Sequence, residues 1–290
     1  MDRPPALIVG CGYVGQRLAR GLVKDFAVYG IVRSTANVSN LRALGVAPLV
    51  ADLDTVTLQD IPSSWYVGST IFYLAPPAAS GQSDARIHHF LNALTDQPAT
   101  LIYISTTGVY GDLQGGVATE STPVNPRTDR ARRRASAEEI TRVWCHERSV
   151  RRVVLRVPAI YGPGRLPLDR IRNGEPAIIE NESPIINRIH VDDLVDALLI
   201  AAREESARGV YNVSDGNALT MTAYLNRVAL LANLSPPSQI TLEHAHLTLG
   251  AGMLSYLDES RRIDNSRMIN ELGVKLRYGK VDEGIRASLV

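Results

Sequence analysis

Short apolar runs alternate along the chain with segments whose apolar residues recur at helical spacing. The helical segments cover residues 14–24, 37–44 and 85–94, and in the first of them Leu18 and Leu22 share one face. The apolar runs lie at residues 6–10, 27–32, 47–50, 70–75, 100–105, 152–156 and 209–214. Continuous apolar strands separated by helices are buried on both faces, as in a parallel sheet. The pattern therefore predicts an α/β fold with a Rossmann-type doubly wound parallel sheet.

Two regions break this alternation. Residues 160–189 are rich in Pro, Gly and Arg, and residues 215–290 have a mostly helical pattern. A chain of 290 residues is long enough for a core domain and a smaller lobe. We therefore assign residues 1–156, completed by residues 190–213, to the Rossmann core. Residues 157–189 and 214–290 then form a small, mostly helical lobe on the substrate side.

The charge balance argues against a polyanionic partner such as a nucleic acid. The chain has 31 basic and 30 acidic side chains, a formal net charge of +1, which gives no net field to hold a polyanion. Cys11 and Cys145 are the only cysteines and cannot build a disulfide framework, which favours a reducing, cytoplasmic compartment. The N-terminus lacks the pattern of a signal peptide, and no apolar run approaches the roughly 20 residues of a membrane helix. We expect a soluble protein without a membrane partner.

The first apolar strand runs into the glycine-rich segment VGCGYVG. Gly10, Gly12 and Gly15 have the spacing GxGxxG, directly after a strand and at the start of a helix. The first two glycines permit a tight turn and a close approach of the backbone to a pyrophosphate, and the third lets helix and strand pack closely. The N–H groups at the helix start then face the phosphates. This context predicts a dinucleotide-binding site.

The second strand ends in IVRS, and this end indicates which dinucleotide is bound. NAD sites usually have Asp or Glu here to accept from the ribose 2′-hydroxyl, whereas this chain has Arg33 and Ser34. A guanidinium and a hydroxyl suit a 2′-phosphate. We therefore expect NADP(H) to be preferred, with NAD(H) as the alternative. An arginine that simply lies in solvent would also fit this position.

Further motifs follow in a fixed order: ADL at residues 51–53, YLAPP at 73–77, STTGVYGD at 105–112, LRVPAIYGPGR at 155–165 and NRIHVDDLVDALLIA at 187–201. With the glycine loop, this series resembles the extended, NAD-dependent epimerase/dehydratase branch of the short-chain dehydrogenase/reductase superfamily along nearly the whole chain. The resemblance implies a set of cofactor-binding residues, mostly at strand ends. They are Gly10, Gly12, Tyr13, Val14, Gly15, Arg33, Ser34, Asp52, Leu53, Leu74, Ala75, Pro76, Ser105, Arg134, Pro158 and Ile160.

The catalytic pair of that family is missing. The family's chemistry rests on Tyr and Lys in the pattern YxxxK, on the helix after the active-site strand, where the tyrosine exchanges a proton with the substrate. Alignment on the family motif puts Arg130 and Arg134 at these two positions, and no lysine lies between Lys24 and Lys275. Arginine stays protonated near neutral pH and cannot exchange that proton. The chain thus resembles an atypical subgroup without the YxxxK pair.

These two arginines belong to a cluster, since residues 125–139 hold five arginines. Arg130 and Arg134 are four residues apart and share one face of a helix, which favours a role in binding ribose or substrate. A solvated helix face is the alternative. Arg132 and Arg133 are expected to point elsewhere, into water or towards acidic residues of the same helix, Glu138 or Glu139.

Other groups must then move protons. Thr106 matches the active-site Ser/Thr of the family and would hold a substrate oxygen. Tyr110 and Tyr161 are the nearest phenols, although both also fit a packing role in structural turns. Thr107 and Gly108 stand where sugar-nucleotide 4,6-dehydratases carry an Asp-Glu pair, which argues against dehydration. The candidate catalytic residues are Thr106, Tyr110 and Arg130.

The candidate substrate-binding residues are Tyr161, Arg165 and Arg188. Both arginines match positions that approach a diphosphate in nucleotide-sugar enzymes, and their alternatives are a surface site and an ion pair with a nearby aspartate. His190 precedes Asp192 and Asp193, but this spacing lacks the ligand set of a closed metal site and better fits a helix start. No metal is expected.

Taken together, the motifs favour an oxidoreductase or epimerase-like enzyme with a nonstandard proton relay. Its substrate would be a small anionic molecule, phosphorylated or similar to a sugar nucleotide. The alternative is a catalytically silent NADP(H)-binding redox sensor or regulatory protein. Relatives often dimerise through the helices after the fourth and fifth strands, whereas the arginines on the second of these helices oppose burial of that surface. A homodimer therefore stays an open alternative.

Overall fold

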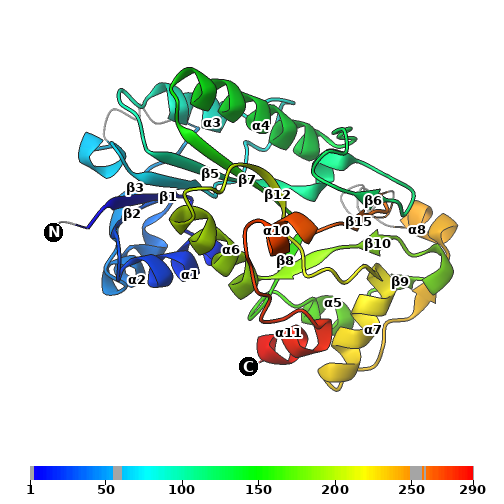
Figure 1. The fold of residues 1–290 in the computed structure, drawn as a ribbon. Helices are drawn as coiled ribbons and strands as arrows, with labels where there is room; N and C mark the ends of the chain where they lie inside the picture. The colour runs from blue at the N-terminus through cyan, green and yellow to red at the C-terminus, as the bar shows by residue number, and fades with distance from the viewer. Residues whose placement is uncertain (1–2, 55–60, 249–256, 258, 290) are drawn as a thin grey trace.

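A seven-stranded parallel sheet forms the centre of the computed structural model, which describes residues 3–54, 61–248, 257 and 259–289. The strands follow the order β12-β7-β5-β4-β1-β2-β3 (Figure 1). Every apolar run of the sequence pattern contributes one strand, so the predicted doubly wound sheet is confirmed. The strands are β1 (Pro5–Val9), β2 (Ala27–Val32), β3 (Ala47–Val50), β4 (Thr70–Tyr73), β5 (Thr100–Thr106), β7 (Arg151–Val157) and β12 (Gly209–Asn212).

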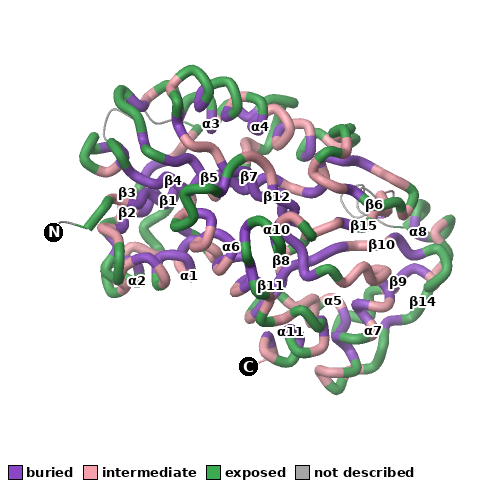
Figure 2. Tube along the Cα trace, in the orientation of Figure 1, coloured by how far each residue is buried: buried purple, intermediate pink, exposed green. Residues whose placement is uncertain are grey.

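Helices cover both faces of this sheet, and the inner strands β1, β4 and β5 are almost fully buried (Figures 1 and 2). One face packs against α1 (Tyr13–Leu22), α2 (Val38–Ala43) and α6 (Val191–Arg203), and the other against α3 (Ala85–Asn92) and α4 (Asp129–Glu147). Successive side chains of a strand point to opposite faces. Ala6 and Ile8 of β1 accordingly lie in the first of these cores, and Leu7 and Val9 in the second.

The strand order places a ligand crevice between β1 and β4. The chain runs from β1 through β2 to β3 at one edge and then crosses to β4 on the other side of β1. Ligands of open parallel sheets bind at such a switch point, outside the carboxyl ends of the strands. The glycine loop follows β1 directly and therefore lies at this point.

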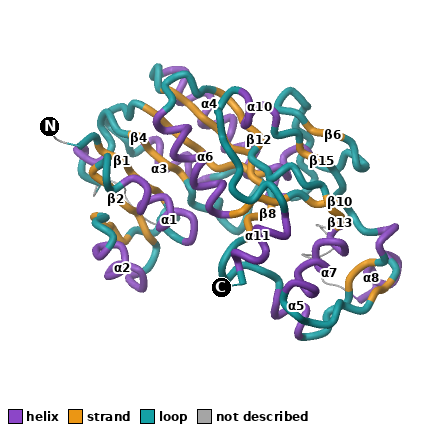
Figure 3. Tube along the Cα trace, turned by 60° about the horizontal axis from the view of Figure 1, so that its bottom comes forward, coloured by secondary structure: helices purple, strands orange, loops and turns teal. Residues whose placement is uncertain are grey.

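A second group of elements lies beside the carboxyl ends of the strands (Figures 1 and 3). Its helices α5, α7 and α11 share an apolar cluster that includes Leu225, Val228 and Ile285. The predicted lobe boundaries stay a prediction, and Met268 and Leu272 pack into the core of the sheet. The helices are α5 (Leu168–Arg172), α7 (Met221–Leu231), α8 (Leu242–Thr248), α10 (Ser266–Asn270) and α11 (Val281–Ser288).

None of the helices among the described residues is long and apolar enough to cross a membrane.

Short strand pairs and 3₁₀ turns make up the other elements. The pairs are β8 (Ala159–Tyr161) with β11 (Arg188–His190), β9 (Ala177–Ile178) with β14 (Gln239–Ile240), β10 (Ile185–Ile186) with β13 (Leu219–Thr220), and β6 (Val117–Ala118) with β15 (Arg262–Ile263). The 3₁₀ turns are η1 (Thr35–Asn37), η3 (Ser63–Trp65), η4 (Thr107–Tyr110) and η5 (Glu180–Glu182).

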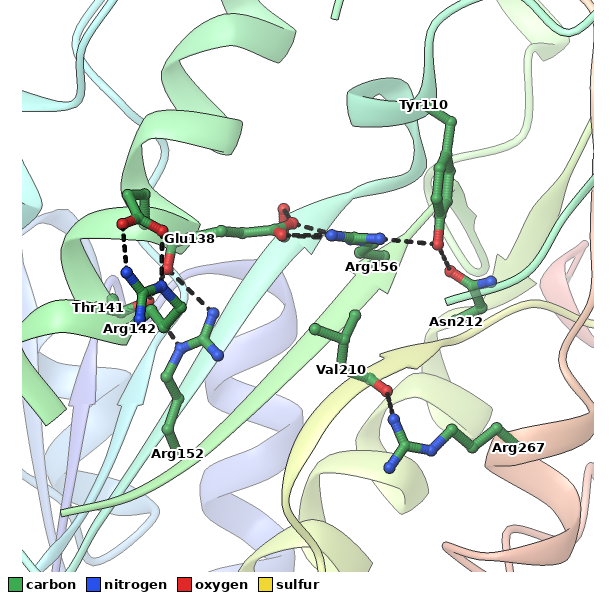
Figure 4. A network of polar contacts seen from close by, with 11 residues as sticks. Tyr110, Glu138, Thr141, Arg142, Arg152, Arg156, Val210, Asn212 and Arg267 are labelled. Carbon is green, nitrogen blue, oxygen red and sulfur yellow. Dashed lines mark hydrogen bonds and ion pairs between the residues drawn. The ribbon is translucent and has the colours of Figure 1, made fainter. Parts of the chain in front are cut away.

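A buried polar network attaches α4 to the sheet (Figure 4). Arg156 of β7 donates to both carboxylate oxygens of Glu138 of α4, from Nε at 3.0 Å and from NH2 at 2.6 Å, and both side chains are less than one-tenth exposed. The Ser105 hydroxyl at the end of β5 donates to the same carboxylate at 2.5 Å. On its other side Arg156 donates to the Tyr110 hydroxyl at 2.9 Å, which donates to Asn212 Oδ1 at 2.7 Å. Helix α4 and strands β5, β7 and β12 are thereby held in one register.

Glu138 and Glu139 offer a matched test of this network, because they are neighbours on α4 and each pairs with an arginine. Glu138→Gln leaves the buried Arg156 without a counter-charge, and we expect a loss of roughly 3 kcal/mol in the free energy of unfolding. Glu139 pairs with Arg142 in solvent, so Glu139→Gln should leave the unfolding curve close to that of the wild type. Urea unfolding followed by circular dichroism measures both, and equal effects of the two substitutions would contradict this role of Glu138.

Candidate active site

The glycine loop joins β1 to α1 in a turn that only glycine can make. Gly10 has a φ of +90°, and a Cβ on it would lie 2.7 Å from the Ala75 backbone nitrogen. A Cβ on Gly15 would lie 3.1 Å from the Gly10 carbonyl oxygen, so the third glycine lets α1 pack onto the loop. Gly12 differs, because a Cβ built there would meet no atom within 4 Å. The loop therefore faces open space where a pyrophosphate would approach.

The start of α1 fits a phosphate group. Gly12 is its N-cap residue, no side chain caps the helix, and its first turn has no acidic residue. The N–H groups of Tyr13 and Val14 thus belong to an uncapped helix start next to the open side of Gly12, which is the arrangement that binds anions at helix N-termini. The Cys11 side chain points the other way, into the core, where burial raises the pKa of its thiol to about 12.

Tyr13 connects the glycine loop to the second group of elements. Its hydroxyl donates to the Pro163 carbonyl oxygen at 3.0 Å. The guanidinium carbons of Arg17 and Arg165 lie 4.0 Å and 4.5 Å from the centre of its ring. Arg165 was expected at the substrate, and the structure instead places it on the glycine loop, because the turn at Gly162 packs against the Tyr13 hydroxyl.

The strand ends around the switch point bring together the segments expected to hold the adenosine half of a dinucleotide. Arg33 and Ser34 follow β2 and are exposed. Asp52 and Leu53 follow β3, and the Asp52 carboxylate accepts from the Asp54 backbone N–H at 3.0 Å. The segment after β4 includes Leu74, Ala75 and Pro76 and lies beside the glycine loop, because β4 pairs with β1. The predicted residues of this half therefore all follow the carboxyl ends of the four strands from β4 to β3.

A cavity of about 580 Å³ opens beyond the ends of β4, β5 and β7, and its lining includes Pro76, which follows Ala75. It is large enough for a small ligand. Seven of the residues predicted from the sequence line it, and they come from four different segments of the chain. They are Pro76, Ser105, Thr106, Arg130, Arg134, Pro158 and Ile160.

Three arginines of α4 line this cavity. Arg134 donates through NH1 to the Ile104 carbonyl oxygen at 2.9 Å and to the Tyr103 hydroxyl at 3.1 Å, which fixes its guanidinium beside the end of β5. Arg133 donates to the Gly81 carbonyl oxygen at 2.7 Å. The third is Arg130.

The expectation that Arg133 points away from Arg130 and Arg134 is wrong. Residues three and four apart lie on one helix face, so Arg133 turns with Arg130 to the same side. The two glutamates expected as partners are also paired elsewhere, Glu138 with Arg156 and Glu139 with Arg142. Arg132 does not line the cavity and pairs with Asp129 at 2.7 Å.

Thr106 lies at the cavity, whereas Tyr110 is buried away from it. Thr106 lines the cavity, and its hydroxyl accepts from the Gly108 backbone N–H at 3.1 Å, at the start of η4. Tyr110 is fully buried, and its hydroxyl is engaged by Arg156 and Asn212. Burial raises the pKa of this phenol, with Arg156 acting in the opposite direction. Tyr110 does not reach the cavity, so the packing alternative holds for it.

Tyr161 and Arg188 are buried away from the cavity as well. Strands β8 and β11 pair in parallel and set Tyr161 opposite His190 in the interior, where the two rings meet edge to face at 5.2 Å. Arg188 is 1% exposed, and its guanidinium carbon lies 4.1 Å from the centre of the Tyr224 ring. Burial lowers the pKa of Arg188 and raises that of nearby Asp215 to about 6. These two residues hold the β8–β11 layer in place and do not line the cavity.

The sequence pattern missed Glu259 and Arg261, which line the cavity opposite α4. They form an ion pair at 2.7 Å, with side chains 10% and 13% exposed. Arg261 also donates to the Gly111 carbonyl oxygen at 2.6 Å. Glu259 Oε1 is buried without a hydrogen-bond partner in the structure. Among the described residues that line the cavity, Glu259 is the one carboxylate, and none is a tyrosine, lysine or histidine.

His190 serves as a helix cap. Its Nδ1 accepts from the Asp192 backbone N–H at 3.2 Å at the start of α6, as the acidic first turn of that helix suggests. No group of histidine, cysteine, aspartate and glutamate side chains that could hold a metal ion occurs within the described ranges.

Comparison with known proteins agrees with this geometry. The chain is 27% identical to Protein YeeZ of Escherichia coli K12 over 280 residues, which cover 93% of this chain and 95% of that protein. The structure of a functionally unknown conserved protein from Silicibacter pomeroyi is similar with a TM-score of 0.81 and 28% identity, over 99% of this chain and 98% of that one.

A third comparison concerns an enzyme of known activity. UDP-glucuronic acid 4-epimerase from Bacillus cereus, in complex with NAD, has the same fold with a TM-score of 0.79 at 17% identity, over 98% of this chain and 97% of that one. The model of the NAD dependent epimerase/dehydratase family matches residues 6–214. Because this match spans the glycine loop, the sheet and most of the cavity, the chain belongs to the NAD-dependent epimerase/dehydratase family.

Proposed function

We propose that this protein is a dinucleotide-dependent oxidoreductase or epimerase-like enzyme that prefers NADP(H) and acts on a small anionic substrate. The observation that carries the proposal is the cavity near the glycine loop, whose described lining residues include four arginines and one carboxylate. The nicotinamide group supplies a hydride acceptor or donor when the cofactor is bound. The residues of this chain would bind the two ligands, orient them and exchange the proton.

The glycine loop supports the cofactor part of this proposal. Gly10, Gly12 and Gly15 leave space for a pyrophosphate at an uncapped helix start. The fold neighbour from Bacillus cereus contains NAD, which favours a nicotinamide dinucleotide over other phosphates. Arg33 follows β2 where a 2′-phosphate would lie, and this favours NADP(H) over NAD(H).

The charges around the cavity support an anionic substrate. Arg130, Arg133, Arg134 and Arg261 line the cavity, and among its described lining residues Glu259 is the one that carries a negative charge. Guanidinium groups bind phosphates and carboxylates through paired, charge-assisted hydrogen bonds. A phosphorylated or sugar-nucleotide-like substrate would match this excess of positive charge.

Proton exchange in this cavity needs a group other than the family's tyrosine. The arginines at that helix position stay protonated and cannot serve. The Thr106 hydroxyl would hold the substrate oxygen, and the Glu259 carboxylate would accept or return the proton. The second candidate function is a silent NADP(H)-binding sensor. One observation favours it: the NH1 group of Arg134 already donates to a main-chain carbonyl and to Tyr103, and therefore contributes less to substrate binding.

Removal of the Arg33 guanidinium should separate the two cofactors. Arg33→Ala should weaken NADPH binding roughly tenfold or more, because a charge-assisted hydrogen bond to the 2′-phosphate is lost, and should change NADH binding little. Fluorescence titration of the wild type and the variant with each cofactor gives the four dissociation constants. A wild type that binds NADH more tightly than NADPH would refute the preference.

Substitution of Glu259 should separate chemistry from binding. Glu259→Gln should lower kcat about 100-fold or more on any active substrate, because the proton acceptor is lost, while NADPH affinity stays unchanged. The assay follows NADPH absorbance against a panel of sugar nucleotides and phosphorylated carbonyl compounds. If the wild type binds NADPH tightly but oxidises it with no member of the panel, the sensor function is favoured instead.

A further inference from the structure

Arg86 joins two of the segments that surround the adenosine half of the site. It is the second residue of α3, and its Nε donates to Asp54 Oδ1 at 2.6 Å, while NH2 bonds the other carboxylate oxygen. Its NH1 group donates to the carbonyl oxygens of Pro76 at 3.0 Å and Pro77 at 3.2 Å. Arg86 therefore ties the segment after β3 to the segment after β4.

The start of α3 holds Arg86 in this position. Asp84 is fully buried and caps the helix, with Oδ1 accepting from the backbone N–H groups of Arg86 at 3.1 Å and Ile87 at 3.3 Å. The Arg86 side chain is 12% exposed, whereas that of Asp54 is 43% exposed. The guanidinium is thus fixed by its helix, and the carboxylate is presented at the surface beside the cofactor cleft.

Arg33 acts on the same carboxylate. Strands β2 and β3 are adjacent and pair Val32 with Val50, so the segments that follow them, with Arg33 and Asp54, leave the same edge of the sheet. The hydrogen bond from Arg86 lowers the pKa of Asp54, and the charge of Arg33 adds to this effect. Arg33 itself makes no ion pair within 4 Å with any residue that the structure describes, and both oxygens of Asp54 bond Arg86.

We propose that the Asp54–Arg86 pair determines how strongly the site prefers NADP(H) to NAD(H), an inference that rests on the proposed cofactor. The Asp54 carboxylate repels a 2′-phosphate bound at Arg33 and competes for that guanidinium. Arg86 occupies and neutralises the carboxylate, which leaves Arg33 to the phosphate. NAD(H) has no 2′-phosphate, so its binding depends much less on either charge.

The two members of this pair therefore have opposite effects on the preference. Asp54→Asn keeps the shape of the side chain and an acceptor for Arg86 but removes the competing charge. The affinity for NADPH should therefore rise relative to that for NADH. Arg86→Gln leaves the Asp54 carboxylate without its partner and free to pair with Arg33, so the affinity for NADPH should fall relative to that for NADH. A bridge with only a structural role would weaken both cofactors alike in both variants.

Fluorescence titration of NADPH and NADH into the wild type, Asp54→Asn and Arg86→Gln tests the proposal. The ratio of the NADH to the NADPH dissociation constant should rise about fivefold in Asp54→Asn and fall about fivefold in Arg86→Gln, the size of effect expected for one unit charge at a solvent-exposed site. Melting temperatures of the variants confirm that each is folded. Asp25→Asn and Arg203→Gln are the matched controls, because that exposed pair, at 2.8 Å, joins the end of α6 to the loop after α1 and should leave the ratio unchanged.

The outcomes separate this inference from the proposed function. Opposite shifts of the ratio support the inference. Ratios that move in the same direction, or that stay at the wild-type value while both cofactors bind, overturn it and leave the proposed function intact. A wild type that binds neither cofactor overturns both.

Discussion

The turn at Gly10 lies so close to the backbone of Ala75 that no side chain fits between them. This contact sets the distance between the glycine loop, at the end of β1, and the segment after β4. The loop faces open space at Gly12, and the lining of the arginine-rich cavity includes Pro76, the residue after Ala75. A dinucleotide along the loop would therefore reach the cavity with its nicotinamide end. The proposed function depends on this adjacency of two sites.

The second constraint is electrostatic. Helix α4 presents three arginines to the cavity, and such a helix face would be poorly held by apolar packing alone. The buried ion pair of Glu138 and Arg156 attaches α4 to strand β7, and the Ser105 hydroxyl links the same carboxylate to the end of β5. Tyr110 belongs to this anchor, which explains why a phenol close to the active-site strand is unavailable for chemistry. Helix α4 thus forms a buried ion pair with the sheet and also contributes cationic side chains to the cavity.

The sheet could be predicted from the sequence because each strand is a continuous apolar run and each helix a periodic one. The glycine loop could be predicted because the strand–turn–helix unit itself requires the glycine spacing GxGxxG, which is visible in the local sequence. The residues Thr106, Arg130 and Arg134 were predicted from the resemblance to the family motifs, and the structure places all three at the cavity.

Residues placed by long-range packing could not be predicted. Arg188 carries the same sequence signal as a surface anion site, and only the pairing of β11 with β8 buries it. Glu259 and Arg261 belong to no motif. They reach the cavity because β15, which follows them, pairs with β6, and Arg262 and Val117 of that pair lie 145 residues apart along the chain. Arg165 reaches the glycine loop only because Gly162 packs on Tyr13.

The central claim is that a nicotinamide dinucleotide docks on the backbone of the glycine loop. Calorimetric titration of NADPH into the wild type and into Gly12→Ala tests it most directly, because a Cβ at Gly12 meets no protein atom and would occupy only the space left for the pyrophosphate. The account predicts binding to the wild type, at least a tenfold loss of affinity in the variant, and the same melting temperature for both proteins without cofactor. Equal affinity of the two proteins, or no binding of any nicotinamide dinucleotide to the wild type, would contradict it.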